Sequence, residues 1–146
     1  MLTGSCLCMA VRYEADEIIG PYVYCHCRSC RKANGTAFAA NIAVPVEAFR
    51  LVSGAQQLRS YESTPGKHRY FCGECGSPIY TAVGDAPKMY RIRLGTLDDA
   101  FSDGPAAHIF VGDKAPWHAI EGDAPQYAGW PDPKALQIAG SRQHKS

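Results

Sequence analysis

Cys25-His-Cys-Arg-Ser-Cys30 holds three of the seven cysteines, and Cys6-Leu-Cys8 and Cys72-Gly-Glu-Cys75 hold the other four. Cysteines of long-range disulfides are usually scattered singly. The ligands of one tetrahedral ion come in close pairs, because several sulfurs must reach it from a short stretch of backbone. The total of seven is odd, and a bridge inside Cys6-Leu-Cys8 or from Cys25 to Cys27 closes a strained ring. The spacing therefore favours metal ligands over disulfides.

The composition is that of an ordinary soluble protein with one domain. Hydrophobic residues make up 46% and charged residues 20% of the 146 residues. The net charge of +1 gives no broad basic footprint for nucleic acid, since only residues 28–32 form a local basic patch. The amino terminus lacks a basic segment followed by an apolar one, and no apolar run reaches the roughly 20 residues of a membrane helix. We therefore expect a cytoplasmic protein, without a membrane partner, whose thiols stay reduced or bind metal.

Short alternating segments rich in Val, Ile, Tyr, Phe and Thr predict β-strands. They cover residues 9–13, 21–24, 36–44, 57–62, 69–71, 77–83, 89–94 and 107–111. Helical periodicity is limited to single turns at 30–33 and 46–49 and a short helix at 132–138, before a frayed end. The prediction is a mostly β, mostly antiparallel domain over residues 1–131, with loops pinned by zinc, followed by a C-terminal tail over residues 132–146.

Cys6-Leu-Cys8 and Cys72-Gly-Glu-Cys75 together supply four thiolates, the composition of a closed structural zinc site. In an extended segment over 5–9, both sulfurs of the first pair point one way and Leu7 faces the core. Gly73 tolerates the unusual backbone angles of a tight turn in the second pair. A redox Cys-x-x-Cys usually opens a helix, whereas this one leads into a predicted strand. Spacing alone leaves open which pair joins which group.

Cys25, Cys27 and Cys30 would occupy three corners of a tetrahedron and leave the fourth open, as in a catalytic zinc site. His26 is the nearest candidate for a fourth ligand. In an extended segment its side chain points away from Cys25 and Cys27, which favours a hydrogen-bonding or packing role. The neighbouring cations favour thiolate and attract an anionic substrate; they are Arg28, Arg31 and Lys32.

The remaining histidines have no ligand spacing. Among them, His108 and His118 are the better functional candidates, because they flank the unusual stretch Asp113-Lys-Ala-Pro-Trp117. The structural alternative for that stretch is a loop whose aromatic residue fills part of the core.

Four motifs between residues 3 and 131, taken together and in their order along the chain, are specific for a known protein family. They are Gly4-Ser-Cys-Leu-Cys8, Cys25-His-Cys-Arg-Ser-Cys-Arg-Lys32, Phe71-Cys-Gly-Glu-Cys-Gly-Ser-Pro78, and His108-Ile-Phe-Val111 leading to Lys114-Ala-Pro-Trp117. The chain resembles the glutathione-dependent formaldehyde-activating enzymes and their centromere-protein-V-like relatives. The resemblance implies coiled antiparallel strands, often called a β-tent. It also implies a structural zinc on Cys6, Cys8, Cys72 and Cys75 and a second zinc on Cys25, Cys27 and Cys30.

The founding activity of that family joins glutathione to formaldehyde to give S-hydroxymethylglutathione, and runs in reverse as a carbon–sulfur lyase. The resemblance implies that catalysis takes place at Cys25, Cys27 and Cys30, with glutathione or another thiol as co-substrate and a small aldehyde as its partner. The two carboxylates of glutathione would be bound by basic residues, with Arg28, Arg31, Lys32, Arg59 and Arg69 as candidates. The alternative is a zinc-stabilised binding or scaffold module without catalysis.

Overall fold

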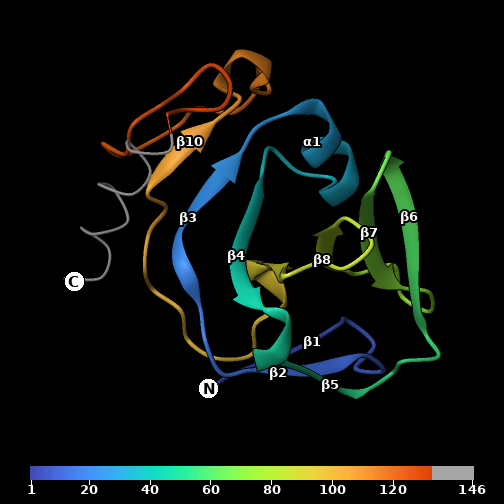
Figure 1. The fold of residues 1–146 in the computed structure, drawn as a ribbon. Coiled ribbons are helices and arrows are strands. Elements are labelled where there is room, and N and C mark those ends of the chain that lie inside the picture. The colour runs from blue at the N-terminus through green and yellow to red at the C-terminus, as the bar shows by residue number, and fades with distance from the viewer. Residues whose placement is uncertain (133–146) are drawn as a thin grey trace. The chain divides into compact units, whose positions relative to one another are not determined.

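The structure, a computed structural model, describes residues 1–132, in which β-strands are the main regular secondary structure (Figure 1). The mostly β prediction is confirmed. The strands are β1 (Leu2–Ser5), β2 (Arg12–Ala15), β3 (Ile19–Cys25), β4 (Ala39–Pro45), β5 (Phe49–Ser53), β6 (Leu58–Thr64), β7 (Lys67–Cys72), β8 (Pro78–Val83), β9 (Met89–Arg93) and β10 (Ala107–Ile109). Short 3₁₀ turns cover Val46–Ala48, Leu94–Thr96 and Val111–Asp113.

Among the described residues, the α-helical structure is α1 (Arg28–Asn34). No helix in this part of the chain is long and apolar enough to span a membrane. Apart from Asp132, the helix predicted over 132–138 and the frayed end lie outside the described residues. The domain boundary after residue 131 stays a prediction.

The chain divides into two compact units, of which the first contains four of the cysteines and the second contains the other three. The first unit is Met1–Ile19 with Ile42–Phe101, and the second is Gly20–Asn41 with the chain from Ser102 onward. In the first unit, β1, β2 and β5 form an antiparallel sheet, and β9, β8, β7 and β6 are neighbours in that order. In the second unit β10 runs parallel to β3, an exception to the predicted antiparallel arrangement.

A series of aromatic rings in contact with one another runs through the first unit. Tyr70 pairs with Tyr80 across β7 and β8, with ring centroids 4.5 Å apart, and Tyr80 lies 4.3 Å from Tyr90. Phe49 continues the contact from Tyr80 to the buried Tyr13, at 5.4 and 5.3 Å. Cross-strand aromatic pairs stabilise sheets beyond the area they bury, so these rings hold both sets of strands in the first unit.

The turn between β5 and β6 requires glycine at residue 54. Gly54 has a φ of 89°, and a Cβ there would lie 2.3 Å from the carbonyl oxygen of Ala10. Gly84 has the same φ, but a Cβ there meets nothing within 4 Å. We expect Gly54→Ala to lower the free energy of unfolding by about 3 kcal/mol and Gly84→Ala by about 1 kcal/mol, because only the first adds a backbone overlap to the cost of the left-handed conformation. Urea denaturation of both variants measures the difference, and equal losses would contradict it.

Candidate metal centres

Four thiols of the first unit meet where two turns come together. The sulfurs of Cys6, Cys8, Cys72 and Cys75 all lie within 4.8 Å of one another. The Cys6–Cys8 distance is 3.6 Å and the Cys8–Cys72 distance is 3.8 Å. Sulfurs about 2.3 Å from a tetrahedral zinc ion are separated by about 3.8 Å. The donor set and its spacing therefore fit zinc, while the assignment of these four residues as ligands stays a prediction.

The segment that carries Cys6 and Cys8 is a turn that leads from β1 back to β2. The N–H of Met9 donates to the carbonyl of Cys6 at 3.0 Å, and Met9 has a φ of 70°. The N–H of Val11 donates to the Cys6 sulfur at 3.2 Å. Leu7 is 83% exposed. The predicted extended segment with Leu7 in the core is therefore wrong, because the chain reverses here to pair the two strands.

The second turn follows β7 and depends on two glycines in different ways. The N–H of Gly76 donates to the carbonyl of Cys72 at 2.7 Å, and Gly76 has a φ of 79°. Gly73 needs space instead, since a Cβ there would lie 2.6 Å from Nε of Arg59. The left-handed residue is Gly76, and the expectation that Gly73 supplies unusual backbone angles is not met.

Ser77 connects the two turns and was missed by the sequence reasoning. Its hydroxyl oxygen accepts a hydrogen bond from the N–H of Leu7 at 2.9 Å and lies 3.2 Å from the Cys75 sulfur. The hydrogen bond from Ser77 lowers the pKa of the Cys75 thiol to about 5. The sequence could have indicated this role, because Ser77 follows Cys75 by two residues and carries a hydroxyl that can reach its sulfur. Ser77 therefore favours a thiolate in this group.

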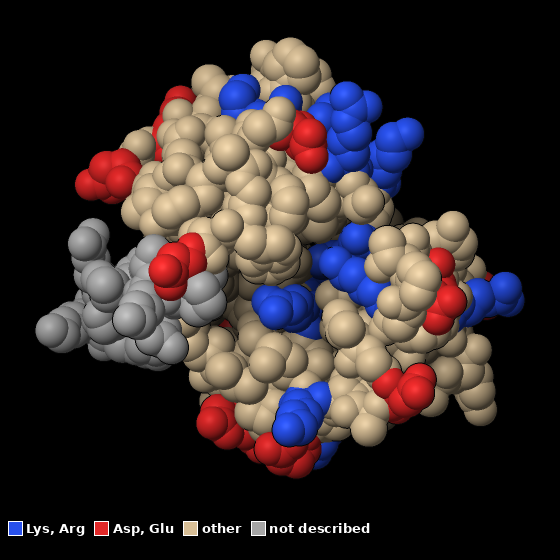
Figure 2. Space-filling model, turned by 45° about the horizontal axis from the view of Figure 1, so that its top comes forward, with Lys and Arg blue, Asp and Glu red and all other residues tan. Residues whose placement is uncertain are grey.

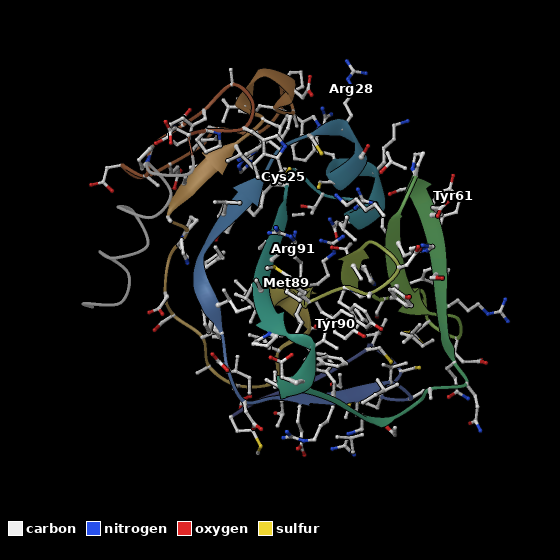
Figure 3. The ribbon with its side chains drawn as sticks, in the orientation of Figure 1. Cys25, Arg28, Tyr61, Met89, Tyr90 and Arg91 are labelled. Atoms are coloured by element: carbon white, nitrogen blue, oxygen red, sulfur yellow. The ribbon has the colours of Figure 1, made fainter. Side chains whose placement is uncertain are left out.

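The three thiols of the second unit come from the end of β3 and the start of α1. Cys25 ends β3, as Figure 3 shows, and its sulfur lies within 4.8 Å of those of Cys27 and Cys30. The Cys27 sulfur caps α1 by accepting a hydrogen bond from the N–H of Cys30 at 3.3 Å. Hydrogen bonding with the Cys27 and Cys30 thiols, with burial, raises the pKa of Cys25. A metal cation bound by these sulfurs would lower the pKa of Cys25 again, because it stabilises thiolates.

Helix α1 is longer than the single turn predicted at 30–33. Gly35 ends it with a φ of 66°, and its N–H donates to the carbonyl of Arg31. Arg31 and Lys32 lie in the last turn, where positive charge stabilises the helix dipole. The capping at both ends explains why a helix this short forms beside the cysteines.

A cluster of histidine and aromatic rings lies in the same unit. His26 is fully buried, and its Nε2 lies 3.0 Å from Nδ1 of His108. This hydrogen bond agrees with the role that the sequence favoured for His26, as a residue that bonds or packs inside the protein. The rings of Phe38 and His118 lie 5.4 and 6.1 Å from His26. Burial lowers the pKa of His26 to about 4 and also lowers the pKa of His108. The imidazole rings of His26 and His108 are therefore uncharged at neutral pH.

Both cysteine groups lie in a region shared with known proteins. A sequence model of the family described as "Glutathione-dependent formaldehyde-activating enzyme" matches residues 1–113. The chain belongs to the glutathione-dependent formaldehyde-activating enzyme family. The resemblance carried by the cysteine motifs is thereby confirmed.

Several relatives of this family member are known. A Halomonas elongata protein named "Putative glutathione-dependent formaldehyde-activating enzyme" is 29% identical, with 90% of each chain covered. A Schizosaccharomyces pombe protein named "Uncharacterized lyase" is 29% identical over 62% of this chain and 64% of its own. The crystal structure of a Rhodobacter sphaeroides protein matches with a TM-score of 0.58 at 24% identity, over 68% of this chain and 91% of that chain, and shows a shared fold.

The basic residues that were candidates for binding glutathione are divided between the two units. Arg28, Arg31 and Lys32 line one pocket of the second unit. In the first unit, Arg59 packs over Gly73. There, Nε of Arg69 donates to the hydroxyl of Ser63 at 2.9 Å. Figure 2 shows Lys and Arg side chains among acidic and uncharged residues on the described part of one face.

We expect His108→Ala to lower the free energy of unfolding by about 2–4 kcal/mol, because it leaves Nε2 of the buried His26 without its partner and opens a cavity. Urea denaturation provides the measurement. His68→Ala is the matched control. His68 is half-buried beside Glu62 at 3.3 Å, and its loss should cost less than about 1 kcal/mol. Equal effects of the two substitutions would show that the His26–His108 contact adds no stability.

Proposed function

We propose that this protein is a zinc-dependent carbon–sulfur lyase-type enzyme that forms and cleaves a thiol–aldehyde adduct, such as S-hydroxymethylglutathione from glutathione and formaldehyde. Family membership and the names of the two relatives support an enzyme of this kind. The observation that carries the proposal is the three-thiol group of Cys25, Cys27 and Cys30. Three ligands leave one corner of a tetrahedron for a substrate.

The reaction needs a nucleophilic sulfur, a carbonyl carbon and one proton transfer. A sulfur–carbon bond forms as the π bond of formaldehyde breaks, and the thiol proton ends on the new hydroxyl oxygen, with no net oxidation. Zinc bound there would supply an open position and lower the pKa of a thiol that occupies it. Cys25, Cys27 and Cys30 would hold the ion, and α1 fixes the positions of the last two. Their contribution is to bring two small reactants together in a fixed orientation.

His26 or a water molecule is our candidate for the carrier of that proton. His26 is buried next to two of the three cysteines, and its Nε2 is held by His108. Its Nδ1 is a buried atom without a hydrogen-bond partner among the described residues. Buried polar atoms usually have a partner, so this nitrogen supports a role for His26 toward a substrate atom or a water.

We propose that the four-thiol group of the first unit holds a structural zinc and that the enzyme works in the cytoplasm. The 3.6 and 3.8 Å sulfur separations support the first assignment. The seven cysteines support the second, because thiols persist where the compartment is reducing.

The test is exchange between glutathione, formaldehyde and their adduct, followed by NMR with zinc-loaded protein. We expect faster exchange than in protein-free buffer and two zinc ions per chain. Exchange no faster than in buffer would rule out this activity for this substrate pair. One zinc per chain, with three readily alkylated thiols, would favour the non-catalytic binding module instead.

A further inference from the structure

One member of the four-thiol group in the first unit lies at the protein surface. All seven cysteines are among the described residues, and Cys8 is the exposed one, whereas the other three members of its group are buried or partly buried. The neighbours of Cys8 are exposed too, since Leu7 is 83% and Met9 is 53% exposed. We infer that Cys8 is an oxidation site, at which hydrogen peroxide starts the formation of a disulfide to Cys72 that releases the structural zinc.

Access to the oxidant decides which thiol reacts first. Peroxides oxidise thiolates that they can reach, while buried cysteines are inert, and a bound zinc ion keeps its sulfur ligands deprotonated. The chain turns back at residues 7–9, all of them exposed, so Cys8 meets solvent between β1 and β2. The three thiols of the second unit are buried or partly buried. The first oxidation is therefore expected at Cys8 and not at the group proposed for catalysis.

The partner of Cys8 follows from distance and ring size. The Cys6 sulfur lies 3.6 Å from that of Cys8, but the two residues are only two positions apart, so a bridge between them closes a strained ring. The Cys72 sulfur lies 3.8 Å from that of Cys8 and comes from the other turn, 64 positions away, where no such ring forms. The Cys75 sulfur is hydrogen-bonded to the Ser77 hydroxyl at 3.2 Å, and that bond opposes its rotation toward Cys8. Cys72 is therefore the expected partner.

The reaction is a two-electron oxidation. The Cys8 sulfur attacks one oxygen of hydrogen peroxide, the O–O bond breaks, and Cys8 becomes a sulfenic acid as one water molecule leaves. The Cys72 sulfur then attacks the Cys8 sulfur, the S–O bond breaks, and a second water molecule leaves as the disulfide forms. The peroxide is reduced to two water molecules, whose added protons come from the thiols or, where these are ionised, from solvent. Zinc loses two of its four ligands and is released.

The consequence is a reversible loss of stability in the first unit. Cys72 is fully buried at the end of β7, and folding and metal binding are coupled in zinc sites of this composition. The disulfide joins the two turns but leaves the other two sulfurs without their ion. A dithiol reductant and zinc restore the site. The four-thiol group thus makes the fold sensitive to peroxide, a property that rests on the structural zinc proposed above and is independent of the lyase reaction.

The test follows zinc and disulfide together in the full, zinc-loaded chain. Hydrogen peroxide is added, zinc release is followed with a chromogenic chelator, and the first disulfide is mapped by mass spectrometry after proteolysis. We expect one zinc ion per chain to leave about tenfold faster than the other, because only its group has an exposed cysteine. A Cys8–Cys72 disulfide should appear at the same rate, and dithiothreitol with added zinc should reverse both changes.

A ligand exchange at residue 8 isolates the contribution of the exposed sulfur. Cys8→His keeps a zinc ligand, since three cysteines and one histidine are a common structural zinc site, but imidazole cannot form a disulfide. This substitution should slow the faster zinc release about tenfold. Cys27→His makes the same change in the second unit and is the matched control, which should leave the faster release unchanged.

The outcomes separate this inference from the proposed function. An unchanged fast release in Cys8→His, a first disulfide other than Cys8–Cys72, or no disulfide would overturn the oxidation site, even if exchange of the formaldehyde adduct is fast. If Cys8→His does not fold, the disulfide map of the wild-type chain decides alone. A Cys8–Cys72 disulfide that forms as zinc leaves supports the site even if no exchange is catalysed, and the failure then lies with the proposed reaction alone.

Discussion

Replacing Cys72 by alanine is expected to unfold the first unit. Cys72 is fully buried at the end of β7, with its sulfur 3.8 Å from that of Cys8. Zinc sites of this kind contribute about 10–16 kcal/mol in small zinc domains, as much as the whole folding free energy of about 5–15 kcal/mol for a typical protein. The loss of one of four ligands should remove most of that contribution. We expect Cys72→Ala to lose cooperative thermal unfolding by circular dichroism and to hold one zinc ion fewer per chain.

Ser77→Ala is the matched control for Cys72→Ala. It keeps all four sulfurs and removes the hydroxyl that contacts the Cys75 sulfur and the N–H of Leu7. Its expected cost is about 0.5–1.5 kcal/mol, the usual range for one hydrogen bond, because the bond to Leu7 is exposed and the contact with Cys75 is part-buried. A Cys72→Ala protein that melts cooperatively near the wild-type temperature would show that this thiol group does not support the fold.

Local spacing placed the cysteines in close groups, and the family resemblance paired Cys6-Leu-Cys8 with Cys72-Gly-Glu-Cys75, which are more than 60 positions apart. Neither predicted the shape of the first turn. Cys6-Leu-Cys8 is compatible with a strand or with a turn. The turn is selected by the hydrogen bonds from Met9 and Val11 back to Cys6, which form because β1 and β2 pair with each other. Tertiary pairing of this kind overrides local periodicity.

The strands β1 and β5 were also missed, for a related reason. Residues Leu2–Ser5 contain Gly and Ser, which are weak strand formers. Contacts distant in sequence hold them, since the hydroxyl of Ser5 donates to Asp98 at 2.9 Å and the N–H of Asp98 donates to the carbonyl of Thr3 at 2.8 Å. The sequence 46–49 favoured a helical turn, and the structure has a 3₁₀ turn at Val46–Ala48 that leads directly into β5.

The contact between His26 and His108 illustrates what no local pattern can predict. The two residues are 82 positions apart and meet because β10 pairs in parallel with β3, with His108 opposite Tyr24. The sequence marked His108 as a candidate through its neighbouring motif, but the partner and the parallel register are tertiary facts. The same holds for Trp117, whose motif was recognisable while its place in the pocket with Arg31 was not.

Replacing Cys30 by alanine is expected to abolish exchange of the formaldehyde adduct while leaving the protein folded. Cys30 is buried within α1, and it supplies one of only three sulfurs in its group. Its backbone N–H, which caps the helix through the Cys27 sulfur, is kept, and alanine favours helix. We expect exchange at the rate of protein-free buffer by NMR, one zinc fewer per chain, and a loss of unfolding free energy of about 1–2 kcal/mol for the buried thiol.

Ser29→Ala separates the loss of a thiol from a general disturbance of the helix. Ser29 is exposed and lies next to Cys30 in α1, so this substitution changes the same element without removing a sulfur. It should keep wild-type exchange and zinc content. If Cys30→Ala also kept both, the three-thiol group would have no part in the reaction. Together with Cys72→Ala, the pair assigns the two groups different tasks, since one substitution should remove the fold and the other only the chemistry.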